Sequence, residues 1–236
     1  MTSISNKLDE FYKKQKLNVS EKKEFWKLVS EVKIKYNHVP KELADKFGTI
    51  KAKNTPWKLY SVKSGILLGI ITFILGIIAW FWWFNYYIFE RNTPLNIIDF
   101  SYWMGFLLWI AFIFLIMEGP HELSHIIVAY LCGIKFNGWG IYRFQPTWDI
   151  EYSSYLQSNF NKRAITHLIG TPINFFQFLF HLIYTTYLNF NFGLLWIPFL
   201  IIYIELIWMG IKEGYGDLPR FFKEIKRKKL HKKIID

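Results

Sequence analysis

Cysteine is almost missing from this sequence: Cys132 is the one thiol in 236 residues. A single cysteine excludes an intrachain disulfide, and it also excludes zinc sites built mainly from thiolates. A metal site in this chain must therefore use histidine and carboxylate side chains, of which the sequence has six and 18.

Acidic residues are few compared with basic ones, since 18 Asp and Glu stand against 29 Lys and Arg, which gives a net charge of +11. At the same time, 52% of the residues are hydrophobic and 20% are aromatic. Charges and apolar residues in these proportions must lie in separate segments, which is typical of a polytopic membrane protein with polar ends. Topology and attraction to anionic lipid explain the positive charge, so we expect a lipid bilayer and no nucleic acid as partner.

Long apolar runs are what the sequence has in abundance. The residues before them are rich in lysine, lack the apolar core of a secretory signal and contain short amphipathic stretches. We therefore expect an all-α polytopic membrane protein with about four transmembrane helices and a small cytosolic helical N-terminal region. The four runs that meet or nearly meet the length a bilayer requires are roughly 62–89, 100–131, 164–188 and 194–211.

The distribution of Lys and Arg indicates how the chain crosses the membrane. Basic residues concentrate before the first span, in the connection from Lys135 to Arg163 and after Arg220. Because basic connections stay in the cytoplasm, we expect a multi-pass protein of the cell membrane with both termini cytoplasmic. Abundant Lys, Ile, Asn and Phe suit an AT-rich bacterial genome. The predicted division is a basic helical region over 1–60, a membrane-embedded domain over 61–219 and a basic tail over 220–236.

Two short helices are predicted in the N-terminal region. One contains an amphipathic stretch that begins after Ser20, a candidate cap. The other runs from Lys41 to Phe47, because Pro40 and Gly48 stand where helices usually start and stop.

The long middle connection is not simply polar. From Ile134 to Phe144, aromatic and polar residues alternate and glycines stand at turn positions, which favours a β-hairpin or a re-entrant sheet at the membrane face. The edge of such a sheet could hold an extended peptide as an added strand. A belt of aromatic residues at the lipid interface explains the aromatics equally well.

The strongest motif lies inside an apolar run and reads His121-Glu122-Leu123-Ser124-His125. Two histidines four residues apart share one helical face and can bind one metal ion. Glu122 is then placed as a general base on metal-bound water, as in zinc hydrolases. An ionisable residue within lipid is penalised by about 2.5–3.5 kcal/mol, so Glu122 requires a partner or a function there.

A catalytic zinc site uses three protein ligands and one open position, so one carboxylate should join the two histidines. Asp217 is the predicted ligand because it lies in a glycine-flanked turn. Glu205, which lies nearer the middle of its span, and Glu213 are the alternatives. His167 and His181 lie in the third apolar run, where a lone histidine is more often structural than a ligand.

These motifs resemble the three core elements of site-2-protease-type intramembrane metalloproteases, and more closely the small zincin peptidases related to them. The elements are the histidine motif, the sequence Gly170-Thr171-Pro172-Ile173-Asn174, which looks unwound at the start of the third span, and the aspartate after the fourth span. The resemblance covers roughly Phe106 to Leu218. It implies zinc held by two histidines and Asp217, and substrate held by Asn174.

The resulting hypothesis is a zinc-dependent endopeptidase that cleaves a membrane-spanning or membrane-associated peptide. Glu122 would take the proton of the attacking water and pass it to the leaving amine. One alternative is a non-catalytic metal-binding accessory or immunity protein of the membrane, against which the presence of Glu122 argues. Another is a metal-binding transporter component, which needs a path through the protein rather than a water-activating glutamate.

Overall fold

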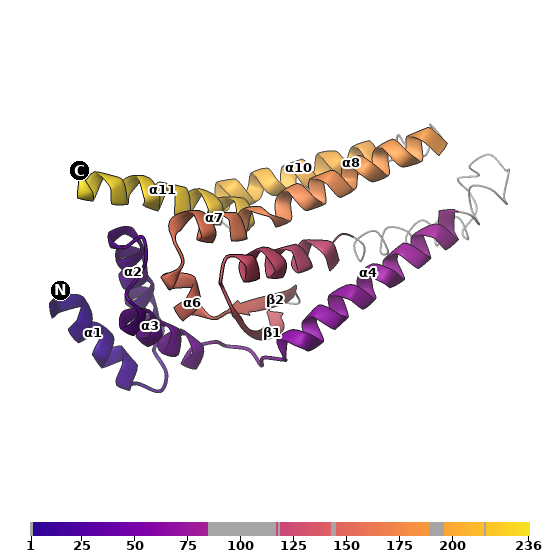
Figure 1. Ribbon diagram of the computed structural model, residues 1–236. Coiled ribbons are helices and arrows are strands. Elements are labelled where there is room, and N and C mark those ends of the chain that lie inside the picture. The colour runs from indigo at the N-terminus through magenta and orange to yellow at the C-terminus, as the bar shows by residue number, and fades with distance from the viewer. Residues whose placement is uncertain (1, 85–116, 118, 143–144, 189–195, 215) are drawn as a thin grey trace. The chain divides into compact units, whose positions relative to one another are not determined.

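The computed structural model describes residues 2–84, 117, 119–142, 145–188, 196–214 and 216–236 (Figure 1). Most of them are helical, and one two-stranded sheet lies among them, so the expectation of a mainly helical chain is confirmed. The chain forms two compact units, one of residues 1–62, 125–169 and 198–236 and the other of 63–124 and 170–197. Much of the second predicted span lies outside the described residues.

The N-terminal helices enclose a small apolar core. They are α1 (Thr2–Lys13), α2 (Val19–Lys35) and α3 (Lys41–Lys53). Each contributes one side of its surface, and Leu8, Phe25 and Phe47 are almost fully buried. This inward-facing apolar stripe is the pattern of helices that fold in water. The predicted helical N-terminal region is therefore present as a bundle of three helices.

Two local predictions in this bundle are wrong. The cap of α2 is Asn18 rather than Ser20: the Asn18 side chain accepts a hydrogen bond from the Glu21 backbone, and the Glu21 carboxylate accepts one from the Asn18 backbone. The helix α3 does not end before Gly48 but continues to Lys53. Gly48 is needed for packing instead, because a Cβ atom there would lie 3.1 Å from the backbone nitrogen of Ser153.

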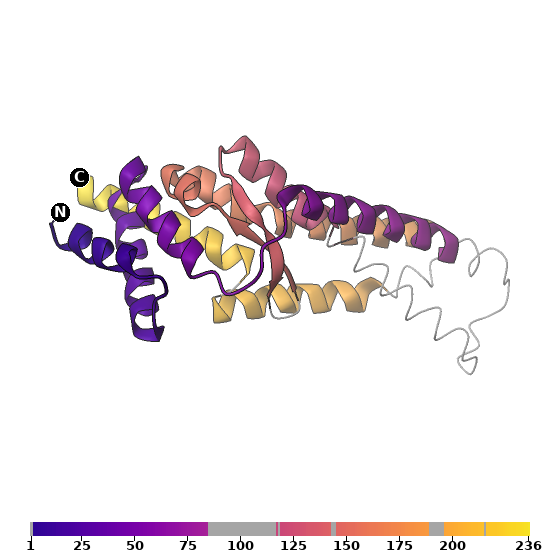
Figure 2. The same cartoon turned by 90° about the horizontal axis from the view of Figure 1, so that it is seen from below.

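A buried ionic cluster joins the C-terminal helix to this unit. Helix α11 (Asp217–Ile235) lies beside α7 (Phe160–Leu168) and also contacts α2 (Figures 1 and 2). Glu224 of α11 pairs with Arg163 of α7 at 3.0 Å, and also with Lys33 and Arg227. Burial alone would raise the pKa of Glu224, but the three neighbouring cations together lower it to about 2. The carboxylate is therefore ionised and holds three segments together.

The sheet is an antiparallel pair of β1 (Phe136–Tyr142) and β2 (Gln145–Ile150), visible in Figure 2. The expected hairpin is present, although it extends to residue 150 rather than ending at 144. The outer edge of β1 is occupied by Tyr60, whose backbone exchanges hydrogen bonds of 2.7 and 3.0 Å with Trp139. A Cβ atom at Gly138 would clash with the Tyr60 carbonyl, so glycine permits this close approach.

Three further helices carry the apolar runs: α4 (Val62–Phe84), α8 (Gly170–Leu188) and α10 (Trp196–Glu213). Within the described part of the chain, Val62–Ala79 is the one stretch long and apolar enough to cross a membrane, with a mean hydropathy of 2.3. Length and composition alone are weak evidence of a span, and the prediction of four spans stays a prediction.

The start of the third apolar run differs from expectation. A turn at Ile169 separates α7 from α8, so residues 164–188 are not one helix. Pro172 explains the break, because it has no N–H to donate to the carbonyl of Leu168. The segment from Gly170 to Asn174 is helical rather than unwound, and Pro172 is tolerated there because it lies in the first turn of α8.

Candidate metal centre

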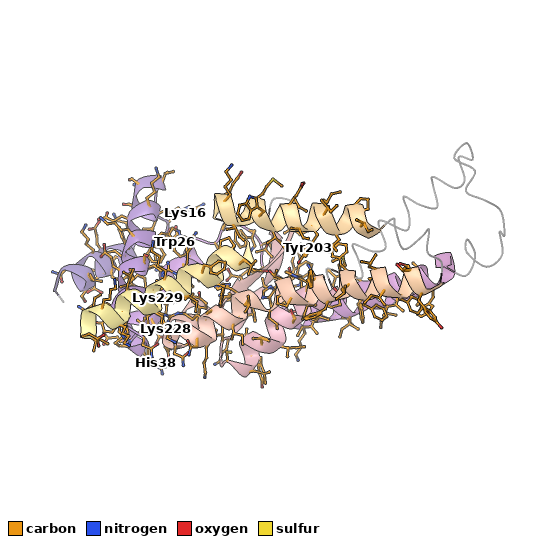
Figure 3. The ribbon with its side chains drawn as sticks, turned by 90° about the horizontal axis from the view of Figure 1, so that it is seen from above. Lys16, Trp26, His38, Tyr203, Lys228 and Lys229 are labelled. Carbon is orange, nitrogen blue, oxygen red and sulfur yellow. The ribbon has the colours of Figure 1, made fainter. Side chains whose placement is uncertain are left out.

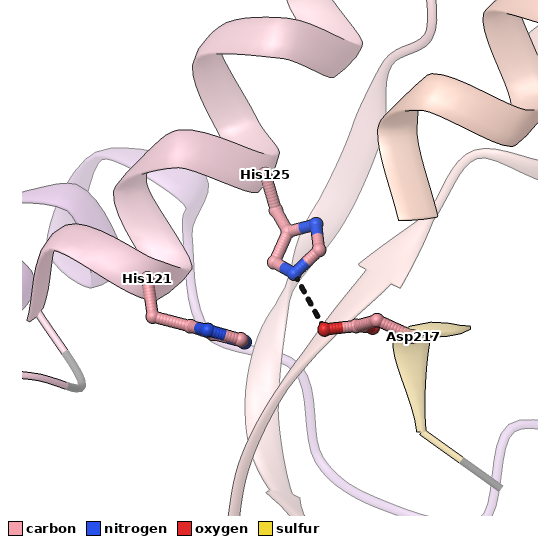
Figure 4. A group of neighbouring side chains, drawn as sticks. All are labelled: His121, His125 and Asp217. Carbon is pink, nitrogen blue, oxygen red and sulfur yellow. Dashed lines mark hydrogen bonds and ion pairs between the residues drawn. The ribbon is translucent and has the colours of Figure 1, made fainter. Parts of the chain in front are cut away.

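The two histidines of the motif lie one turn apart on a continuous helix over residues 119–131. Asp217 is the first residue of α11 and follows Gly216, whose φ of 88° only glycine adopts readily. One ligand atom from each of His121, His125 and Asp217 lies within 4.8 Å of the others (Figure 4). The structure therefore brings together the three residues expected to bind metal.

His125 has a defined tautomer in this arrangement. Its Nδ1 lies 2.7 Å from the backbone carbonyl oxygen of Thr166. A carbonyl oxygen only accepts, so Nδ1 carries the hydrogen and donates it. The Nε2 atom of the neutral ring then has a lone pair, and that atom lies 3.0 Å from Oδ2 of Asp217. Two acceptors at this distance attract each other only when a proton or a metal cation lies between them.

Two imidazoles and one carboxylate are donors that zinc accepts. Bonds of 2.0–2.1 Å in a tetrahedral site place neighbouring ligand atoms about 3.3 Å apart, close to the 3.0 Å that separates His125 and Asp217. The limit of 4.8 Å for the whole cluster requires a small side-chain movement to bring all three to one ion. Two imidazoles and one carboxylate would leave a fourth position of a bound zinc ion for water, and the Thr166 carbonyl would be the outer hydrogen-bond partner of the ligand His125.

Helix α7 contacts both His125 and helix α11, which carries Asp217. It provides the Thr166 carbonyl that holds His125 and, one turn earlier, Arg163 that holds Glu224. Glu224 lies about two turns after Asp217 on α11. The sequence did not reveal these supporting residues, because nothing local to a backbone carbonyl or an amphipathic helix says which distant side chain it will meet.

Two further predicted site residues, Glu122 and Asn174, lie on helices and outside the cluster of three ligands. Glu122 lies on the motif helix and is half-buried, and its role as base stays a prediction. Asn174 lies on α8 with its side chain buried, and its Oδ1 accepts no hydrogen bond from a described residue. It belongs to the compact unit of residues 63–124 and 170–197, and its contact with substrate also stays a prediction.

The alternative ligands do not belong to the cluster found among the described residues. Glu205 and Glu213 are exposed on α10. His167 pairs with the hydroxyl of Tyr155 at 2.8 Å, and His181 is buried on α8. These positions leave Asp217 as the carboxylate beside the two histidines.

Comparison with known proteins adds no relative: no family model, no curated protein and no solved structure matches this chain. The motif and the geometry around it are what indicate a function.

Proposed function

We propose that this protein is a zinc-dependent endopeptidase of the membrane, of the site-2-protease type. The observation that carries the proposal is the cluster of His121, His125 and Asp217, in which Nε2 of His125 lies 3.0 Å from a carboxylate oxygen of Asp217. A glutamate directly after the first histidine completes the residue pattern of zinc hydrolases.

The chemistry supplied by zinc at such a site is Lewis acidity toward a water molecule and the scissile carbonyl. Glu122 accepts the proton of the attacking water and gives it to the leaving amine nitrogen. Asp217 would offset part of the positive charge of the ion, and the hydrogen bond from Nδ1 of His125 to the Thr166 carbonyl would direct Nε2 of the neutral ring toward the ion.

Exposed apolar side chains support a location in the membrane. Large aliphatic residues cover α4 on several sides, among them Leu67, Ile71 and Ile78, which are 58%, 43% and 58% exposed. Leaving such a surface in water is unfavourable by roughly 25 cal/mol per Å², whereas lipid accommodates it. We place the protein in the cell membrane as a multi-pass protein with both termini cytoplasmic, because the lysine-rich ends favour that side.

The substrate in this proposal is a peptide segment of a membrane-spanning or membrane-associated protein, bound in extended form. A helix hides its own carbonyls in hydrogen bonds, so the segment must unwind before cleavage. Tyr60 already occupies the outer edge of β1, so in this proposal an extended peptide adds to β2, the other strand of the sheet that the described residues form. Asn174 supplies an amide that can donate to and accept from a peptide backbone.

The test compares full-length wild type with Glu122→Gln, expressed in the same cells. We expect equal zinc content in the purified proteins, and new membrane-protein termini in wild-type membranes only, because an amide cannot accept the water proton. Mass spectrometry measures both quantities. Glu205→Gln is the matched control, since Glu205 is exposed and outside the cluster, and it should retain zinc and cleavage.

Each contrary result has a definite meaning. Cleavage by Glu122→Gln near the wild-type rate would remove Glu122 as the base. Zinc in both proteins with no cleavage by either would favour the non-catalytic metal-binding accessory or immunity protein. Loss of zinc from the Glu205→Gln protein would show that the third ligand is wrong.

A further inference from the structure

A polar cavity of about 570 Å³ lies in the unit that contains the N-terminal bundle. It is bordered by the start of α3, the turn after the helix over 119–131, α6 (Tyr152–Gln157) and the start of α7. None of the residues of the metal cluster lines it. The cavity is therefore a separate feature from the metal centre.

Three lysines from three separate segments line this cavity. They are Lys41 on α3, Lys135 before β1 and Lys162 on α7. None of their ammonium groups forms an ion pair with an acidic residue in the described part of the chain. All three side chains are exposed and border the same space, so an anion bound there is attracted by three ammonium groups.

Two acidic residues, Asp45 and Glu151, also line the cavity. The hydroxyl of Ser153 donates to a carboxylate oxygen of Asp45, and three lysines against two carboxylates leave the lining with one more positive than negative charge. Asn159 adds a further donor, because its side-chain oxygen accepts from the Lys162 backbone while its NH₂ group has no described partner. The lining thus offers ammonium and amide donors to a ligand that accepts hydrogen bonds.

We propose that this cavity binds a phosphate ester. Phosphate oxygens are strong acceptors and the group carries roughly −1.5 to −2 charges at pH 7 as a monoester. The volume lies within the range of roughly 300–1,000 Å³ of small-molecule sites, which exceeds the size of one phosphate and leaves room for a polar group esterified to it. The ligand is a soluble phosphate ester or the head group of an anionic lipid, and the second source fits the proposed membrane topology.

The experiment titrates full-length protein in an uncharged detergent and records the melting temperature. One probe is glycerol 3-phosphate, and the other is dihexanoyl phosphatidic acid, with glycerol and dihexanoyl phosphatidylcholine as controls. A ligand that binds the folded state raises the melting temperature in a saturable way. Saturation by glycerol 3-phosphate identifies a soluble source, and saturation by the phosphatidic acid alone identifies a lipid head group.

Two triple variants test where the ligand binds. Lys41→Gln, Lys135→Gln and Lys162→Gln together should weaken binding at least about tenfold, because charge-assisted hydrogen bonds are lost. The fold should survive, since Lys41 and Lys162 lie in first helical turns, where a positive charge is not stabilising. The matched control changes three exposed lysines outside the cavity, of which Lys16 and Lys229 are labelled in Figure 3: Lys16→Gln, Lys27→Gln and Lys229→Gln.

The control variant loses the same net charge and should bind as the wild type does. Equal weakening by both triple variants would show non-specific attraction and overturn the proposal, as would the absence of a saturable shift with either phosphate probe. The readout uses neither zinc nor proteolysis, so its outcome is independent of the proposed enzymatic function.

Discussion

The N-terminal bundle and helix α4 use the same kinds of side chain in opposite ways. In the bundle, Phe25 and Phe47 are 2% and 0% exposed, whereas Leu67 and Ile78 of α4 are both 58% exposed. The sequence pattern follows this difference: apolar residues of α2 recur every three or four positions, while those of α4 cover its whole circumference. The proposed membrane location requires this difference, with water around the bundle and lipid around α4.

The largest expected effect comes from removing an aromatic ring inside the bundle. Phe47→Ala leaves a cavity and should lower the free energy of unfolding by about 3–5 kcal/mol. Phe81→Ala on α4, where the ring is 50% exposed, should change it by only about 0.5 kcal/mol. Hydrogen exchange of α3 and α4, measured separately in detergent, gives both values. Equal losses of unfolding free energy in the two variants would contradict the difference between the bundle and α4.

Introducing a lysine on α4 and on α2 tests the same difference between the two regions. Ile71→Lys, in the middle of α4, should make membrane insertion of that helix less favourable by about 2.5–3.5 kcal/mol. Val19→Lys on α2, where the side chain already projects from the helix surface, should change the stability of the bundle by about 0.5 kcal/mol or less. The inserted fraction in a glycosylation-mapping assay measures the first effect. Unchanged insertion would mean that lipid does not surround α4.

Acid should act on the unit with the bundle and not on α4, which contains no acidic residue. The pKa of Glu224 is about 2 in the folded protein and 4.5 without the fold. A lowered carboxyl pKa contributes stability above pH 4.5 that is lost as the pH falls toward 2. We expect a loss of up to about 3 kcal/mol over that window. Denaturation at pH 6 and pH 2 measures it.

Glu224→Gln is the control for the acid effect, because the amide does not titrate. This variant should be less stable at pH 6, since three cations lose their common partner, and the part of its pH dependence between 4.5 and 2 should disappear. An unchanged acid response in the variant would assign the effect to other carboxylates.

Several elements of the fold could be predicted from local patterns. Histidine spacing predicted that His121 and His125 share one helical face, and the glycines around Asp217 predicted a turn that the structure contains, with φ of 79° at Gly214 and 88° at Gly216. These features depend on periodicity and backbone freedom within a few residues, which a single sequence displays.

The features that sequence reasoning missed depend on contacts between distant segments. Gly48 was predicted to end a helix because glycine often does so. Its packing role could not be predicted, because the neighbour that requires it, Ser153, is about a hundred residues away along the chain. Asn18 and Ser20 are both good caps, and only the geometry of the first turn selects between them. The sequence does not predict the Arg163–Glu224 pair either, since each residue alone is typical of a solvated helix face.

The position of Asp217 and Glu224 on one helix has a thermodynamic consequence. A cation that binds Asp217 and His125 also holds α11 against α7, because the Arg163–Glu224 pair lies on the same two helices as Asp217 and the Thr166 carbonyl. By linkage, a cation present at a hundred times its dissociation constant would stabilise this packing by about 2.7 kcal/mol. Loosening the packing would weaken cation binding by the same free energy, so the tightness of a helix interface and the occupancy of the cluster would rise and fall together.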